Sequence, residues 1–158
     1  RDILLIGLTG LITLLLQTTW IPQHAFLGST PNLLLVFLAA LGLWKGTFFS
    51  IPAGSLIGFL LGILNKHFLV SFLIWTMVGI VLGLVENNRF NKTRFLIIVN
   101  TLIGTAALYF FYWTASTLFL KESIYTPLDM LLLTTLLNIL CAALFFPLGK
   151  LLGKAEPI

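Results

Sequence analysis

The side chains that could do acid–base or metal chemistry are few in this chain and lie far apart in the sequence. No pair of carboxylates and no group of residues with metal-ligand spacing can be recognised among them. A single cysteine excludes an internal disulfide, and no glycine-rich phosphate loop occurs. We therefore expect no catalytic site, no cofactor and no metal site. The protein is expected not to be an enzyme. The residues concerned are Asp2, Glu86, Glu122, Asp129, Glu156, His24, His67 and Cys141.

Small residues form the more informative pattern, in the segment 29–65. They recur at every fourth position, and on a helix this spacing places side chains on one slowly drifting stripe. In lipid, such a stripe lets another helix backbone approach closely. The stripe consists of Gly46, Ser50, Gly54, Gly58 and Gly62.

A second small-residue face follows in the segment 68–85, where Ser71, Gly79 and Gly83 share one stripe. Two interpretations of these faces stay open at this point. The two stripes could pack against each other within the chain, or the longer stripe could receive a helix of a partner protein. A second copy of the chain is a further possible partner.

The composition identifies the class of protein that must hold these stripes. Hydrophobic residues make up 59% of the chain and charged residues only 9%, against about 25% charged in soluble domains. Apolar runs near membrane-spanning length recur throughout. We expect one all-α domain over residues 1–158, a polytopic bundle in the membrane.

Six spans are expected. The second is capped by Ser29 or Thr30 with Pro31 in its first turn, and it is short for a crossing. The third contains Pro52, which lies in the first turn if Ser50 caps the helix. If the helix begins at Thr47 instead, Pro52 kinks it and the helix is long enough to cross. Asn65 ends the third span and opens a polar turn. The expected spans cover residues 3–20, 31–45, 47–64, 68–85, 95–119 and 129–149.

Basic residues set the expected orientation. With six spans, seven of the nine Lys and Arg residues fall on the side that holds both termini. The positive-inside rule then places both termini in the cytoplasm. The net charge of +4 is explained by this topology rather than by nucleic acid. The cytoplasmic side could contact anionic lipid or a cytoplasmic protein, through Lys45, Arg89, Lys92 and Arg94.

Three polar residues, Gln17, Asn100 and Asn138, fall inside the expected spans. They would cross-link helices, or they would line a ligand cavity. No ionisable residue lies inside a span, so ion-coupled transport finds no support.

The order of these features resembles a known family, the bacterial rod shape-determining protein MreD. The similar segments are LLLQTTW (14–20), PNLLLVFLAALGLWKG (31–46) and GSLIGFLLGILN (54–65). Members of that family often carry Asp where this chain has Asn32 and Asn65. The resemblance implies a six-helix fold related to the substrate-binding S components of energy-coupling factor transporters.

The resemblance also implies a function in the bacterial cytoplasmic membrane. A protein similar to MreD would be a scaffold of the cell-elongation complex, linking the actin-like MreB and the periplasmic MreC to the peptidoglycan synthases. The small-residue stripe would then receive the transmembrane helix of MreC. The alternative is an S component of a vitamin transporter, with an outer pocket built from Trp20, His24, Lys121, Glu122 and Asp129.

Overall fold

The computed structural model describes residues 2–65, 67–85, 94–120 and 128–153. These residues form a bundle of α-helices, and their only β-type pairing is an isolated bridge between Phe26 and Ser29. The helices are α1 (Asp2–Leu15), α2 (Leu33–Lys45), α3 (Thr47–Asn65), α4 (Phe68–Leu84), α5 (Arg94–Ala115) and α6 (Leu128–Gly153). Short π- or 3-10 helical segments extend α1 and α5: η1 (Leu16–Trp20), η2 (Ile21–His24) and η3 (Ser116–Leu120).

The predicted helices are confirmed in number and order for the described residues, and most of their bounds agree closely with the prediction. The main correction concerns the start of α2. The helix begins at Leu33 and its cap is Asn32, so the predicted cap by Ser29 or Thr30 is wrong and Pro31 lies outside the helix. α3 begins at Thr47 and keeps Pro52 inside it.

The expectation of six spans, the second of them short, is met only in part by the helices of the described residues. Within the described part of the chain, four helical segments are long and apolar enough to cross a membrane: Ile3–His24, Thr47–Leu64, Phe95–Leu118 and Leu128–Pro147. The other two helices, α2 with 13 residues and α4 with 17 residues, are shorter. At about 1.5 Å per residue α2 rises only about 20 Å, which is less than the roughly 30 Å of a hydrocarbon core.

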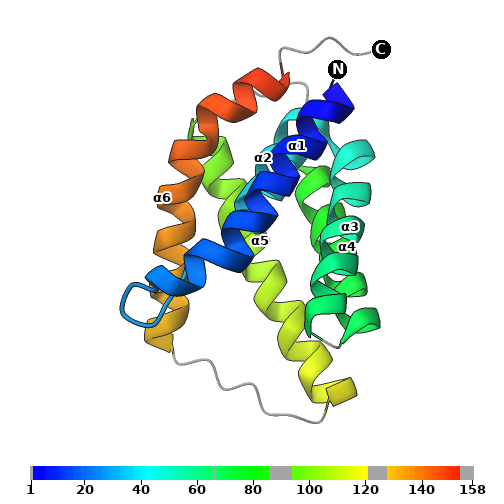
Figure 1. Ribbon diagram of the computed structural model, residues 1–158, viewed down its shortest axis with the longest axis vertical. Coiled ribbons are helices and arrows are strands. Elements are labelled where there is room, and N and C mark those ends of the chain that lie inside the picture. The colour runs from blue at the N-terminus through cyan, green and yellow to red at the C-terminus, as the bar shows by residue number, and fades with distance from the viewer. Residues whose placement is uncertain (1, 66, 86–93, 121–127, 154–158) are drawn as a thin grey trace.

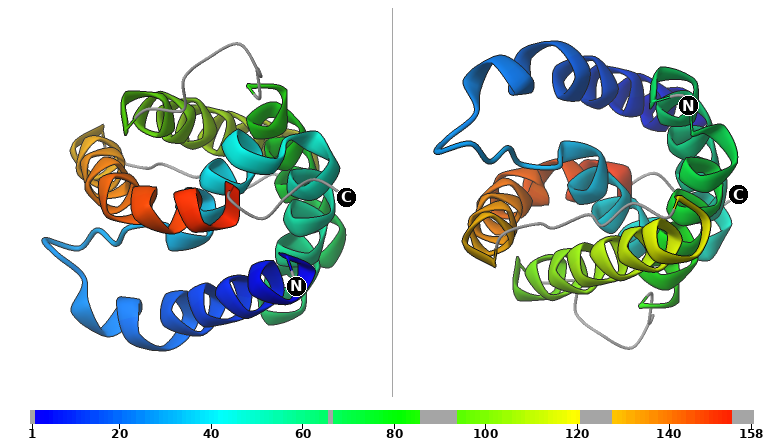
Figure 2. Two further views of the ribbon diagram at one scale, coloured as in Figure 1. Left: turned by 90° about the horizontal axis from the view of Figure 1, so that it is seen from above. Right: turned by 90° about the horizontal axis from the view of Figure 1, so that it is seen from below.

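The short helix α2 is the centre of the bundle. Every residue from Leu34 to Trp44 is buried, because α1, α3, α4, α5 and α6 all contact it. Figure 2 shows α2 enclosed by the other helices when the bundle is viewed along its length. A helix that is apolar on all sides is expected in such a position.

The remaining helices differ greatly in how firmly they are held. α3 and α4 form a tightly packed antiparallel pair (Figure 1). α1 lies across the outside of the bundle, and most of its large apolar side chains are exposed. The start of α1 and the end of α6 lie at the same end of the bundle (Figure 1), where α2 ends at Lys45 and α5 begins at Arg94.

Candidate helix-docking grooves

The small-residue stripe of α3 lies directly against α4. A Cβ atom added at Gly58 would lie 2.6 Å from the carbonyl oxygen of Ser71, and one added at Gly62 would lie 2.8 Å from the Cα atom of Phe68. A Cβ atom at Gly54 would likewise overlap the backbone carbonyl of Trp75. The glycines of α3 are therefore required for contact between two backbones.

The small residues of α4 meet α3 in the same way. A Cβ atom at Gly79 would lie 2.5 Å from the carbonyl oxygen of Ser50, and one at Gly83 would lie 2.6 Å from the Cα atom of Thr47. The hydroxyl of the fully buried Ser50 donates to the carbonyl oxygen of Gly79 over 2.8 Å. Since α4 fills the stripe, the structure favours internal packing over partner docking for these residues.

Gly46, the first member of the predicted stripe, has a different role. It caps the C-terminus of α2 with a φ of +69°, a left-handed conformation that glycine adopts without strain. Its amide donates to the carbonyl oxygen of Gly42 over 2.9 Å. Gly42 lies outside the predicted stripe but packs against the backbone of α4, since a Cβ atom there would lie 2.7 Å from the carbonyl oxygen of Leu82.

The partly buried N-terminus of α2 is capped by three polar side chains. The first amides of a helix lack partners within the helix, and lipid cannot supply them. Here the side chain of Asn32 accepts from the amide of Leu35 over 3.1 Å. The side-chain oxygens of Asn138 and Gln17 accept from the next free amides, those of Asn32 and Leu33, each over 2.7 Å.

The network continues from this cap into the neighbouring helices. The amide group of Asn138 donates to the hydroxyl of Thr105 over 3.2 Å, which joins α6 to α5. Ser29 is buried and donates to the carbonyl oxygen of Met130 over 3.2 Å. Gln17 and Asn138 therefore act as helix caps and cross-links, as the first interpretation of the sequence expects.

Asn100, the third polar residue singled out in the sequence, lies fully buried on α5. Its amide nitrogen donates to the carbonyl oxygen of Ala39 on α2 over 2.8 Å, so it cross-links α5 to the central helix. Its side-chain oxygen has no hydrogen-bond partner among the described residues.

The predicted basic contacts are only partly within the described residues. Arg89 and Lys92 lie outside them, as do the side chains of Arg94 and Asn65. Lys45, at the end of α2, lies 5.9 Å from the ring centroid of Phe49, a distance typical of a cation–π contact.

The predicted outer pocket is also only partly described. Lys121 and Glu122 lie outside the described residues, and Asp129 is exposed in the first turn of α6. The rings of Trp20 and His24 contact each other, tilted by 31° with their centroids 4.4 Å apart, and both are exposed. No group of potential metal ligands is found in the described part of the chain.

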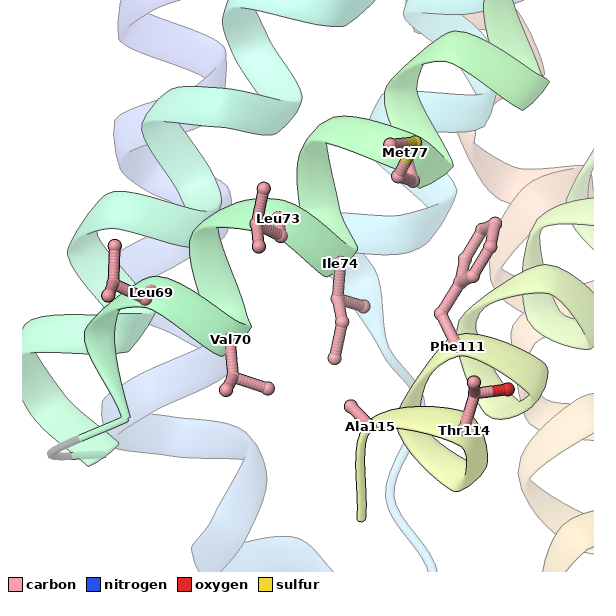
Figure 3. Close-up of a pocket in the computed structure, with 8 residues that line it drawn as sticks. All are labelled: Leu69, Val70, Leu73, Ile74, Met77, Phe111, Thr114 and Ala115. Atoms are coloured by element: carbon pink, nitrogen blue, oxygen red, sulfur yellow. The ribbon is translucent and has the colours of Figure 1, made fainter. Parts of the chain in front are cut away.

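Two apolar grooves open on the side of the bundle. The first lies between α4 and the end of α5, with a volume of about 380 Å³ (Figure 3). Large side chains point into it from both helices, so a partner backbone could not approach closely. Its lining consists of Leu69, Val70, Leu73, Ile74, Met77, Phe111, Thr114 and Ala115.

The second groove lies between α1 and α3, above α2, and has a volume of about 280 Å³. Small residues line part of both walls: Gly7 and Gly10 on α1, and Ala53 on α3. A Cβ atom at Gly7 would meet nothing within 4 Å, and one at Gly10 would only touch the ring of Phe37 at 3.4 Å. Large apolar side chains make up the rest of the lining, so Gly7 and Gly10 mark the part of this α1–α3 groove where the described chain leaves room for another backbone.

Sequence reasoning missed the α1–α3 groove because it ranked stripes by length. The signal available was the three-residue spacing of Gly7 and Gly10 in the first span.

Comparison of the chain with protein-family models, curated proteins and solved structures gives no match.

Proposed function

We propose that this chain is a membrane scaffold of the bacterial cell-elongation complex, which binds the transmembrane helix of MreC and helps to couple MreB to the peptidoglycan synthases. The resemblance of segments 14–20, 31–46 and 54–65 to MreD motivates this proposal. The helical bundle with its apolar spans agrees with it.

The observation that carries the proposal is the open α1–α3 groove. Apolar burial does not drive helices together in lipid, so association depends on close backbone approach at small residues. Gly7 has open space around it, and Gly10 meets only the ring of Phe37 at 3.4 Å, so this part of the groove offers such an approach. We therefore assign the docking of the MreC helix to this groove rather than to the stripe of α3.

The polar side chains inside the bundle favour a scaffold over a vitamin-binding protein, because they form hydrogen bonds within the chain. Gln17, Asn32 and Asn138 are used to cap α2. A vitamin site needs convergent polar groups that are free to bind a ligand. The groove between α4 and α5 is also apolar, but no glycine lines it, so it offers a partner helix no comparable position of close backbone approach.

The test is co-purification. Tagged protein is extracted from its native bacterial membrane in mild detergent, and the proteins that accompany it are identified by mass spectrometry. Gly7→Leu fills the groove from a position with open space around it, so the fold is retained while the recovery of MreC falls at least tenfold. The matched control is Ile12→Phe, which adds bulk to the same helix at a position that does not line the groove.

Three results would overturn the proposal. Recovery of a transporter ATPase pair or a bound vitamin would identify an S component instead. Recovery of only a second copy of the chain would make the groove a self-association surface. Equal recovery of MreC with Gly7→Leu and with Ile12→Phe would show that the helix binds elsewhere.

A further inference from the structure

The connection between α1 and α2 ends in an unusual turn. The amide of Phe26 donates to the carbonyl oxygen of Ser29, and the amide of Ser29 donates to the carbonyl oxygen of Phe26, both over 2.9 Å. The residues between them have positive φ angles, +50° at Leu27 and +82° at Gly28. This combination is typical of a type I′ hairpin turn.

Leucine is a poor residue for this position. Left-handed conformations bring Cβ too close to the following carbonyl oxygen, so Asn, Asp or Gly normally occupy the first central position of such a turn. Leu27 is nevertheless 77% exposed, so contacts of its side chain within the described chain do not offset the energy of this backbone conformation. A strained and exposed apolar residue points to an interaction outside the chain.

The base of the turn is fixed at a known level of the bundle. The hydroxyl of Ser29 donates to the carbonyl oxygen of Met130 in the first turn of α6. The neighbouring residue Asp129 is exposed, and a carboxylate requires water or lipid headgroups around it. The turn is therefore held at the depth of the membrane–water interface.

The surroundings of the turn favour lipid as the partner. Segment 21–32 contains no Lys, Arg, Asp or Glu, and it runs along the periphery of the bundle beside α6 rather than across its end (Figures 1 and 2). Trp20 and Phe26 are also exposed, by 57% and 59%. Tryptophan with an apolar body and a polar N–H is typical of the interfacial layer.

We propose that the turn Phe26–Ser29 is a membrane anchor that inserts Leu27 and Phe26 into the interfacial layer of the bilayer. Lipid then removes the apolar surface of Leu27 from water. The hydrogen bond from Ser29 to Met130 connects the anchor to the first turn of α6. This proposal is independent of the identity of the partner in the α1–α3 groove.

Spin labelling of the full chain in phosphatidylethanolamine–phosphatidylglycerol vesicles tests the anchor. In a Cys141→Ala background, labels are placed at Leu27→Cys and at Gln23→Cys, an exposed polar position in the same connection. We expect the label at residue 27 to be relaxed mainly by oxygen, which concentrates in lipid. The label at residue 23 should be relaxed mainly by a water-soluble nickel chelate.

Two outcomes would overturn the anchor. Relaxation of residue 27 by the nickel chelate to the same degree as residue 23 would place it in water. Weak relaxation by both reagents would mean that protein covers it. A label at Phe26→Cys repeats the measurement at a position with an ordinary backbone conformation, so a distorted turn at residue 27 cannot explain the result.

Discussion

The substitutions Gly58→Ala and Gly7→Ala should have different effects on the free energy of unfolding: the first should lower it, and the second should not. In Gly58→Ala the new methyl group would lie 2.6 Å from the carbonyl oxygen of Ser71 and 2.9 Å from the Cα atom of Phe72. In Gly7→Ala the new methyl group meets nothing within 4 Å. Both changes are chemically identical, so any difference reports the surroundings.

The magnitude follows from the distances. Ordinary contacts of a Cβ atom begin near 3.4 Å, so the α3 and α4 backbones must separate by several tenths of an ångström to admit the methyl group at residue 58. Overpacking of this kind costs about 1–3 kcal/mol, while alanine gains at most about 1 kcal/mol of helix propensity. Because the overlap is with backbone atoms, the upper part of this range applies, about 2–3 kcal/mol. Subtracting about 1 kcal/mol of helix propensity leaves an expected loss of about 1–2 kcal/mol of unfolding free energy for Gly58→Ala.

The assay is reversible unfolding in mixed micelles with increasing sodium dodecyl sulfate, followed by circular dichroism and tryptophan fluorescence. Gly7→Ala should keep the wild-type midpoint or raise it, by at most about 1 kcal/mol in free energy. Equal destabilisation by both variants, or no loss with Gly58→Ala, would refute the conclusion that α4 fills the stripe of α3.

Two further predictions concern the cap of α2 and the orientation of the chain. Asn138→Leu leaves the partly buried amide of Asn32 without its acceptor, and the same unfolding assay should show a loss of about 1–3 kcal/mol; an unchanged midpoint would contradict the capping role. In a Cys141→Ala background, a membrane-impermeant maleimide added to intact bacterial spheroplasts should label Gln23→Cys but not Asn91→Cys, and the reverse pattern would invert the predicted topology.

The positions of the helices were largely predictable from the sequence, because they depend on local features. Long apolar runs bounded by polar segments indicate membrane helices wherever they occur. The start of α3 at Thr47, with Pro52 inside the helix, was one of two alternatives that the sequence allowed. The shortness of α2 was also visible before the structure.

The partners of these helices were not predictable, because they depend on residues far apart in the chain. Four-residue spacing identifies a helix surface suited to close packing, but the same spacing serves internal and external contacts. Only the position of α4 shows that the stripe with Gly54 and Gly58 is filled. Likewise, Asn138 caps the amide of Asn32, a pairing across most of the sequence that no local pattern indicates.

Site-specific photocrosslinking in the native membrane tests the proposed docking of the MreC helix most directly. A benzophenone amino acid is placed at Leu11, which lines the α1–α3 groove, or at the adjacent Ile12, which does not. Both positions are exposed, by 53% and 49%, so they react equally well with lipid. We predict a crosslink to MreC from residue 11 that is much stronger than the one from residue 12. Crosslinks of equal strength, or none to MreC from residue 11 while MreC still co-purifies, would contradict the assignment of this groove.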